Sequence, residues 1–207
     1  MDFFHSLHGA NVLAPGVLMA TVAVVARFSS WPTAMLWKGF QALSVAALAL
    51  AVVALVSGAY RLPWSGWAAA SVFSLGLAAL VQGLGTVIGS FSSRYLQGEA
   101  GQRRYIVMLA GVLACVHLLL LADHWLLLIA AWAGVGLALQ YLLCFYPDRP
   151  FARLAALKKR IADRAADALL LGAAALAWLE VGSGSLSALW LHAAQQGMST
   201  ALHASAV

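Results

Sequence analysis

The chain has 207 residues, of which 63% are hydrophobic and 9% are charged, and its mean hydropathy is +0.89. Soluble domains carry about a quarter charged residues, so this composition excludes an ordinary soluble protein and indicates one integral membrane domain over residues 1–207. The net charge of +5 comes from Lys and Arg in short loops, which is typical of membrane topology. Nucleic-acid binding is therefore not expected.

Six apolar stretches are long enough, or nearly so, to cross a hydrocarbon core of about 30 Å. Lipid offers no hydrogen-bond partners, so apolar runs of this length without alternation must be helices. In chain order they are residues 12–25, 36–60, 67–90, 105–121, 126–146 and 165–179. We predict an all-α, polytopic membrane helix bundle with six spans.

The end of the chain adds two weaker signals. Residues 186–194 are predicted to form a short interfacial helix, and residues 198–207 read as the first half of a seventh span. A span of about ten residues is too short to cross a bilayer. The chain is therefore expected to be a fragment, the N-terminal part of a longer membrane protein, or a truncated protein.

Lys and Arg are unevenly distributed among the loops. The first, third and fifth loops and their flanks hold eleven of them, whereas the opposite side holds only Arg61. Short loops rich in Lys and Arg stay in the cytoplasm. We predict a multi-pass inner-membrane protein with its N-terminus on the periplasmic side.

Two polar residues near the fourth and fifth spans need an explanation. His117 is predicted to lie in the bundle interior, where it either hydrogen-bonds to a neighbouring helix, the favoured interpretation, or carries protons. Asp123 lies in the following turn and is predicted to cap the next helix, although an ion-relay role stays open.

Four further residues inside the spans are interpreted as packing residues. Gln82 and Gln140 can hydrogen-bond across helices, and Gly85 with Gly89 has the small-xxx-small spacing that lets two helices approach closely.

Nine of the nineteen charged side chains fall between Asp148 and Asp167, directly before the last apolar stretch. Arg164 can pair there with either Asp163 or Asp167, which keeps a carboxylate ionised at membrane depth. The ion-relay candidates are therefore Asp167 and Arg164, with Lys158 extending the charges toward the cytoplasm. Six further basic residues on this side are predicted to dock a partner: Arg149, Arg153, Lys159, Arg160, Arg103 and Arg104.

Catalysis by this chain is not expected. The sequence has no Ser/His/Asp order and no phosphate-binding loop, and Cys115 and Cys144 both lie in apolar stretches. His5 and His8 are two possible metal ligands without a third. We predict no catalytic residue, no metal site and no cofactor in this chain.

Three motifs resemble the proton-translocating antiporter-like subunits, the family of complex I subunit 5 and the Mrp antiporters. They are IGSFSSRYLQGEAGQRRY at residues 88–105, LADHWLLLIAAWAGVGLALQYLL at residues 121–143 and KKRIADRAADALLL at residues 158–171. The resemblance places the family's sixth-helix arginine and aspartate at Arg164 and Asp167. It also shows a departure, because Ala133 follows Trp132 where the pumping members have a glutamate.

The branch that is most similar is the DabB type, the membrane subunit of a complex that accumulates dissolved inorganic carbon; FYPDRP and the following KK carry this similarity. The resemblance implies a cytoplasmic, DabA-like partner with a zinc site. It implies hydration of CO2 to bicarbonate in that partner, coupled to cation flow, expected to be H+, through the membrane subunit. Two alternatives stay open: an anchor or assembly subunit that moves no ions, and a subunit of complex I or an Mrp antiporter.

Overall fold

The computed structural model describes residues 2–58, 66–146 and 148–196, with side chains from Asn11 to Gln195. Arg61, the predicted seventh span at residues 198–207, and the side chains of His5 and His8 lie outside this description. The described part forms seven helices: α1 (Asp2–Phe28), α2 (Thr33–Ser57), α3 (Val72–Tyr95), α4 (Gln102–Leu121), α5 (Trp125–Leu143), α6 (Pro150–Val181) and α7 (Leu186–Gln196).

The predicted all-α, polytopic class is confirmed, with a difference in the number of spans. Residues Asn11–Phe28 of α1 and the whole of α2, α3, α4 and α5 are long and apolar enough to cross a membrane. α6 is not among them, because Asp167 and Glu180 leave an uninterrupted apolar stretch only at residues 168–179, short of the ~20 residues that a span needs. The chain is a multi-pass membrane protein with five such helices among the described residues.

The third span starts later than predicted, at Val72 instead of Trp67. Residues before it are extended, since Ala68 forms an antiparallel bridge with Ala122 and the N–H of Ala69 donates to Leu121 O at 2.9 Å. Ser71 then begins α3 with a capping box shared with Ser74, which satisfies two backbone N–H groups at the helix start.

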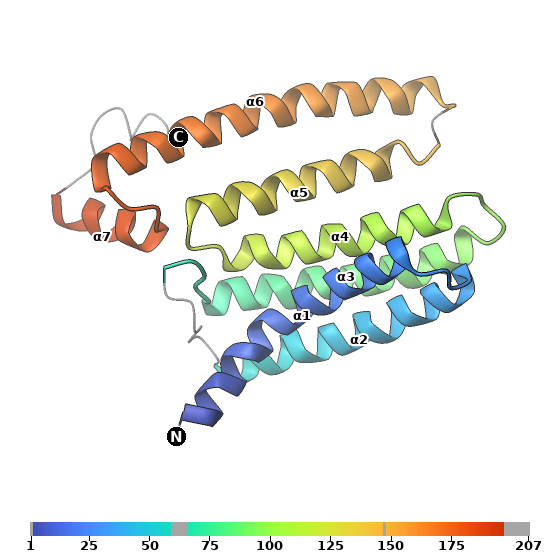
Figure 1. Cartoon of the computed structure of the whole chain (residues 1–207), viewed down its shortest axis with the longest axis horizontal. Helices are drawn as coiled ribbons and strands as arrows, with labels where there is room; N and C mark the ends of the chain where they lie inside the picture. The colour runs from blue at the N-terminus through green and yellow to red at the C-terminus, as the bar shows by residue number, and fades with distance from the viewer. Residues whose placement is uncertain (1, 59–65, 147, 197–207) are drawn as a thin grey trace.

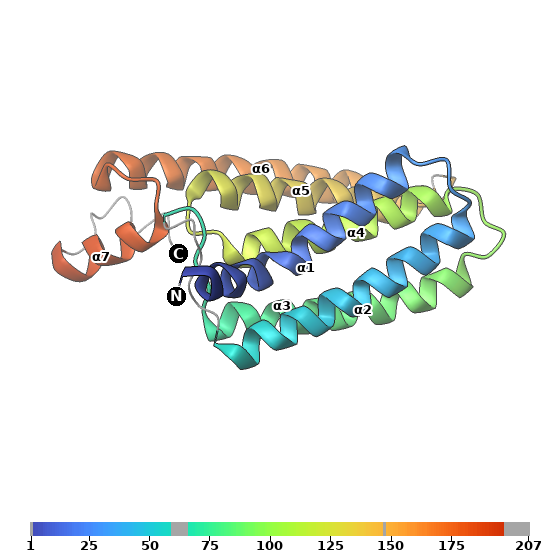
Figure 2. The same ribbon diagram turned by 60° about the horizontal axis from the view of Figure 1, so that its bottom comes forward.

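From α4 onward the helices are arranged in sequence across the molecule. α1 to α4 form the core group, α5 packs beside α4, and α6 packs beside α5 as the outermost long helix (Figure 1, Figure 2). The core group buries large side chains such as Met19, Phe40 and Ile106, whereas α5 and α6 each bury only two alanines. α6 is therefore in contact with the bundle along one face, and its remaining faces are exposed.

A polar layer crosses the centre of the core group. Gln82 of α3 donates from Nε2 to Ser44 Oγ of α2 at 2.8 Å, and its Oε1 lies 3.0 Å from His117 Nε2 of α4. Thr86 lies 2.7 Å from Ser44 through the two hydroxyl oxygens. The favoured interpretation of His117 as a residue hydrogen-bonded to a neighbouring helix is confirmed, and Gln82 is the side chain that connects three helices.

Replacing Gln82 with Leu is expected to lower the free energy of unfolding by about 1 kcal/mol, because His117 and Ser44 both lose a buried partner. Thermal unfolding of the purified protein in detergent measures this change. Gln97→Leu is the matched control, since Gln97 is exposed in a turn and should leave the melting temperature unaltered. Equal melting temperatures for both variants would contradict the connecting role of Gln82.

Glycines set the distance between α3 and its neighbours. A Cβ at Gly85 would lie 2.5 Å from Leu113 Cδ2, and a Cβ at Gly89 would lie 2.1 Å from Phe40 Cε1. These distances are shorter than any van der Waals contact, so the predicted packing role of both glycines is confirmed.

Candidate ion-pair groove between α5 and α6

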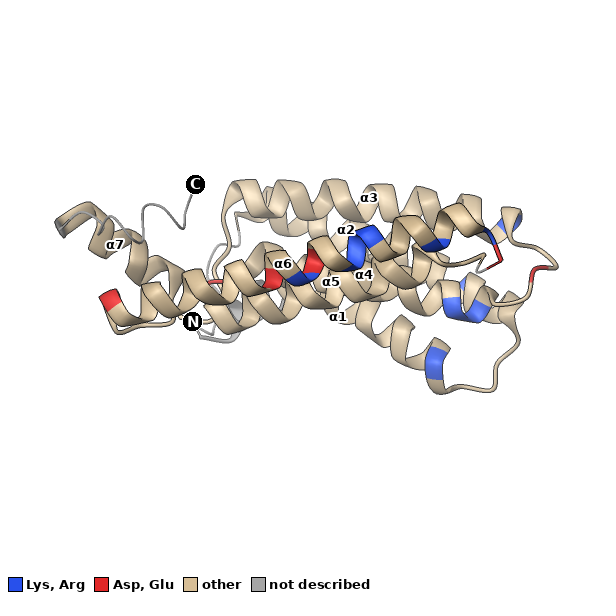
Figure 3. Cartoon of the chain, turned by 90° about the horizontal axis from the view of Figure 1, so that it is seen from above, with Lys and Arg blue, Asp and Glu red and all other residues tan. Residues whose placement is uncertain are grey.

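Charge is distributed along the bundle in a simple way. Lys and Arg gather toward the end at which α1, α3 and α5 finish and α2, α4 and α6 begin (Figure 3). α6 starts there with Pro150 at its first position, where the missing N–H costs nothing. Its helical run continues through the charged segment, so the charges from Arg153 to Asp167 lie on one helix.

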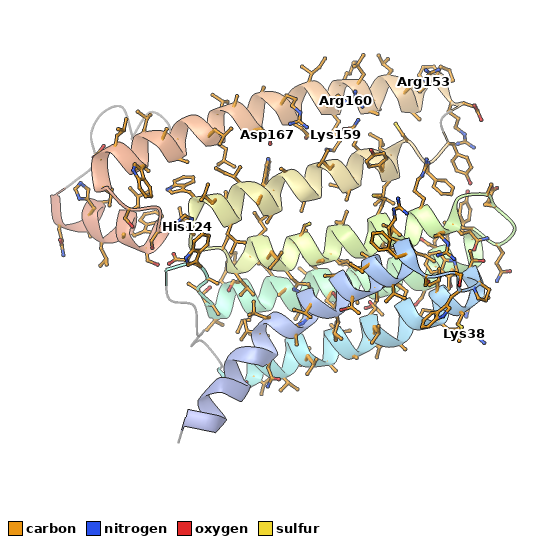
Figure 4. The ribbon with its side chains drawn as sticks, viewed as in Figure 1. Lys38, His124, Arg153, Lys159, Arg160 and Asp167 are labelled. Atoms are coloured by element: carbon orange, nitrogen blue, oxygen red, sulfur yellow. The ribbon has the colours of Figure 1, made fainter. Side chains whose placement is uncertain are left out.

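The Arg164–Asp167 pair forms as predicted. Arg164 Nη1 donates to Asp167 Oδ2 at 3.3 Å, and the side chain of Asp167 is 18% exposed against 66% for Arg164. The carboxylate thus lies in the α5–α6 interface while the guanidinium reaches outward. Figure 4 shows Asp167 on the side of α6 that faces α5.

A second ion pair lies one turn earlier on α6, between Lys159 and Asp163. Lys159 Nζ also donates to the backbone carbonyl of Gly136 on α5 at 3.1 Å. Lys159, predicted as a docking residue, therefore faces the interface, whereas Lys158, predicted as a relay residue, is exposed and forms no ion pair among the described residues. The sequence contained a signal for this orientation of Lys159. Positions 156, 159, 163 and 167 have helical spacing and therefore share one face of α6, on which Ala156 is buried.

Both pairs line a groove of about 150 Å³ between the two helices. The α5 side of the groove includes Trp132, Ala133, Gly136 and Gln140, and no lining residue that α5 contributes is ionisable. Gln140 faces Arg160: with the amide oxygen turned toward it, that oxygen accepts from Nε at 2.8 Å. The predicted cross-helix hydrogen bond of Gln140 is therefore one to a charged group.

Two predicted docking residues are instead used inside the chain. Arg103 donates through Nη1 to Ala26 O at 2.8 Å and to Ser29 O at 2.6 Å, and through Nη2 to Trp31 O. Arg104 donates to the carbonyls of Cys144 and Phe145. Carbonyls at a helix C-terminus have no partner within the helix, and a cation satisfies them well. Arg103 thus closes the end of α1 and Arg104 the end of α5.

Replacing Arg103 with Ala is expected to lower the free energy of unfolding by about 1.5 kcal/mol, the low end for hydrogen bonds to a charged group, since water can reach part of this site. The melting temperature in detergent measures it. Arg153→Ala removes an exposed cation of the same end of the bundle and should have no effect. A melting temperature for Arg103→Ala equal to that of the control would contradict the capping role.

The basic residues at the start of α6 are exposed, as their predicted role in docking a partner requires. Arg149 precedes the helix and lies over the ring of Tyr146, with Cζ 4.8 Å from its centroid. Arg153 is exposed near the helix start (Figure 4). Docking of a partner by these residues stays a prediction.

Asp123 caps a helix other than the one predicted. Its Oδ1 accepts from the backbone N–H of Ser187 at 2.9 Å and from the hydroxyl of Ser187 at 2.6 Å, so it caps α7, and His124 caps α5. The reason is that residues 122–124 are extended and bridge to the loop before α7 through His124 and Ser185. Asp123 therefore lies at the opposite end of the bundle from the basic residues, and it does not line the groove.

Metal ligands do not cluster in the described part of the chain, where no three His, Cys, Asp or Glu residues come together. The free thiols Cys115 and Cys144 lie on different helix segments. The groove's ionisable groups are two carboxylates, one ammonium and two guanidinium groups. Such a set can bind and pass on a proton or a monovalent cation.

Comparison with known proteins gives relatives of two kinds. No family model matches the chain. It is 34% identical over 128 residues to the probable inorganic carbon transporter subunit DabB of Hydrogenovibrio crunogenus and 39% identical over 132 residues to DabB2 of Halothiobacillus neapolitanus. It is also 33% identical over 109 residues to NADH-quinone oxidoreductase subunit L of Escherichia coli. The chain is homologous to the DabB and subunit L proteins.

The resemblance to DabB-type subunits predicted from the motifs is thereby confirmed. The matched region covers 61% and 63% of this chain but only 24% of each DabB relative, and 53% of this chain and 18% of subunit L. The chain therefore spans about a quarter of the length of the DabB-type relatives that it matches.

Proposed function

We propose that this chain forms part of the membrane subunit of an energy-coupled complex that accumulates inorganic carbon. In this proposal, cation movement, with H+ as the ion, drives hydration of CO2 to bicarbonate in a soluble, DabA-like zinc subunit. The observation that carries the proposal is the pair Arg164–Asp167, set in a groove between helices of a chain that is homologous to DabB-type subunits.

The depth of Asp167 supports an ion-carrying role. Counting from the basic end of α6, Asp167 is the last charged residue before the apolar residues 168–179. An ionisable group at membrane depth is costly unless it is paired, and it therefore favours a functional role. Arg164 supplies the pairing, and the groove supplies room for water beside the carboxylate.

The proposed orientation of the chain in the membrane rests on the distribution of Lys and Arg. We propose that the end carrying Lys and Arg faces the cytoplasm of the inner membrane, which places the N-terminus on the periplasmic side. The exposed residues Arg149, Arg153 and Lys158 would then meet the soluble partner. Zinc and CO2 hydration belong to that partner, and this chain contacts membrane lipids around its exposed apolar faces.

The test uses the full-length membrane protein expressed with its soluble partner in a bacterium that lacks carbonic anhydrase. We expect growth in air without added CO2, and we expect a protonophore to abolish this growth while a CO2-enriched control culture still grows. Expression of the partner alone should give no growth. Growth in air by the partner alone would contradict the proposal.

A second candidate function is an anchor or assembly subunit that moves no ions. Ala133 favours it, because a methyl group lines the groove where the pumping members of the resembled family carry an acid. Proton flux into proteoliposomes that contain the whole complex separates the two functions, since an anchor should give no flux above empty vesicles. The homology to subunit L also keeps a complex I or Mrp-type role in view, and sodium-dependent or quinone-linked activity would indicate it.

A further inference from the structure

The groove contains a complete second ion pair on the path from the basic end to Asp167. We propose that Asp163, paired with Lys159, is a second ion-carrying acid, which receives the proton from Asp167 on its way to the basic end. This inference rests on the proposed function and adds a residue and a direction to it.

Lys159 and Asp163 both line the groove and form an ion pair there. Their side chains are 25% and 29% exposed, so both members of the pair are shielded, unlike the exposed Arg164. The ammonium group is held from the other side by the carbonyl of Gly136. Two acceptors on two helices thus fix the cation, and the carboxylate stays beside the cavity.

Gly136 is what allows this arrangement. A Cβ at this position would lie 3.3 Å from Asp163 Oδ2 and 3.9 Å from Lys159 Nζ. The absence of a side chain lets the α5 backbone approach the pair, so that a main-chain carbonyl contacts the ammonium group. Any side chain at position 136 would press on the carboxylate.

The order of the groups defines a path. Asp163 and Asp167 are four residues apart on one helix, which is about 6 Å along the axis, and both line the same cavity. A proton that passes from Asp167 through cavity water to the carboxylate of Asp163 neutralises it and releases Lys159, which keeps its hydrogen bond to Gly136. Loss of that proton toward the basic end restores the Lys159–Asp163 pair, and the ionised Asp167 pairs again with Arg164.

A purely structural role for the pair makes a different prediction. If it only ties α6 to α5, then Asn at position 163 should serve almost as well, because its amide oxygen still accepts from Lys159. An ion-carrying role requires a group that binds and releases a proton. Asn fails this requirement, whereas Glu meets it.

The experiment measures proton flux into proteoliposomes that contain the full-length membrane protein with its partner, using a pH-sensitive dye inside the vesicles. We expect Asp163→Asn to lose flux down to the level of empty vesicles, Asp163→Glu to retain part of it, and the exposed-residue control Asp148→Asn to match the wild type. Flux equal to wild type in Asp163→Asn, with flux lost in Asp167→Asn, would overturn this inference and leave the proposed function standing. No flux in the wild type would overturn both.

A second variant keeps the test decisive if Asp163→Asn does not accumulate in the membrane. Gly136→Ala retains every charge and inserts only a methyl group beside the carboxylate, so we expect a reduced flux. Gly172→Ala is its control, because a Cβ at Gly172 meets nothing within 4 Å. Equal flux in these two variants would count against the inferred role of the pair.

Discussion

Asparagine at position 167 is expected to abolish growth in air of cells that depend on the full-length protein and its partner. In the wild type, Arg164 Nη1 lies 3.3 Å from Asp167 Oδ2. The substitution preserves the size of the side chain and an oxygen that can accept from Arg164. It removes the ability to bind and release a proton at the deepest charged position of the groove. Growth without added CO2 is the measurement, with immunoblots of the membrane fraction to show that the variant is present.

Asp148→Asn is the control for this variant, because it makes the same chemical change at an exposed position outside the groove. It should grow as the wild type does. Undiminished growth of Asp167→Asn in air would exclude the relay role of Asp167 and would favour the anchor function.

Alanine at position 89 is expected to give the largest loss of stability, about 2 to 3 kcal/mol in the free energy of unfolding. The new Cβ would lie 2.1 Å from Phe40 Cε1, and the ring of Phe40 is fully buried with no room to retreat. Small-to-large changes in a packed core cost about 1 to 3 kcal/mol, and here two helices must separate. Thermal unfolding in detergent measures the effect.

Gly76→Ala is the matched control on the same helix, since a Cβ at Gly76 meets nothing within 4 Å. Alanine is favoured over glycine in a helix interior by about 1 kcal/mol, so this variant should melt at the same temperature or higher. The two substitutions should therefore act in opposite directions. Equal melting temperatures for the Gly89→Ala and Gly76→Ala proteins would show that α2 and α3 are less closely packed than in the structure.

Relations within a single helix were largely predictable. The i, i+3 spacing of Arg164 and Asp167 predicted a pair that the structure contains, because helix geometry alone brings these positions together. The Lys159–Asp163 pair follows from the same rule at i, i+4. It was missed because the assignment of Lys159 to a cytoplasmic surface ignored that this helix face is turned toward α5.

Relations between helices were predicted in kind but not in detail. Gln140 was expected to hydrogen-bond to another helix, and its partner is Arg160 on α6, twenty residues further along the chain. Asp123 was expected to cap the next helix, and it caps α7, more than sixty residues further along the chain. No local pattern encodes which loop folds back against which helix.

The sequence by itself determined the membrane class, the helical segments and the side of the bundle that carries the positive charge, because hydropathy and Lys/Arg counts act over short stretches of chain. Only the tertiary structure decided which of those charges are free. Arg103 and Arg104 bind the carbonyls at helix ends, and Lys159 pairs with Asp163. Lys158 and Arg153 are both exposed. The physical reason is that a cation's partner is set by the packing of helices distant in the chain, which brings carbonyls and carboxylates to it or leaves it in contact with solvent.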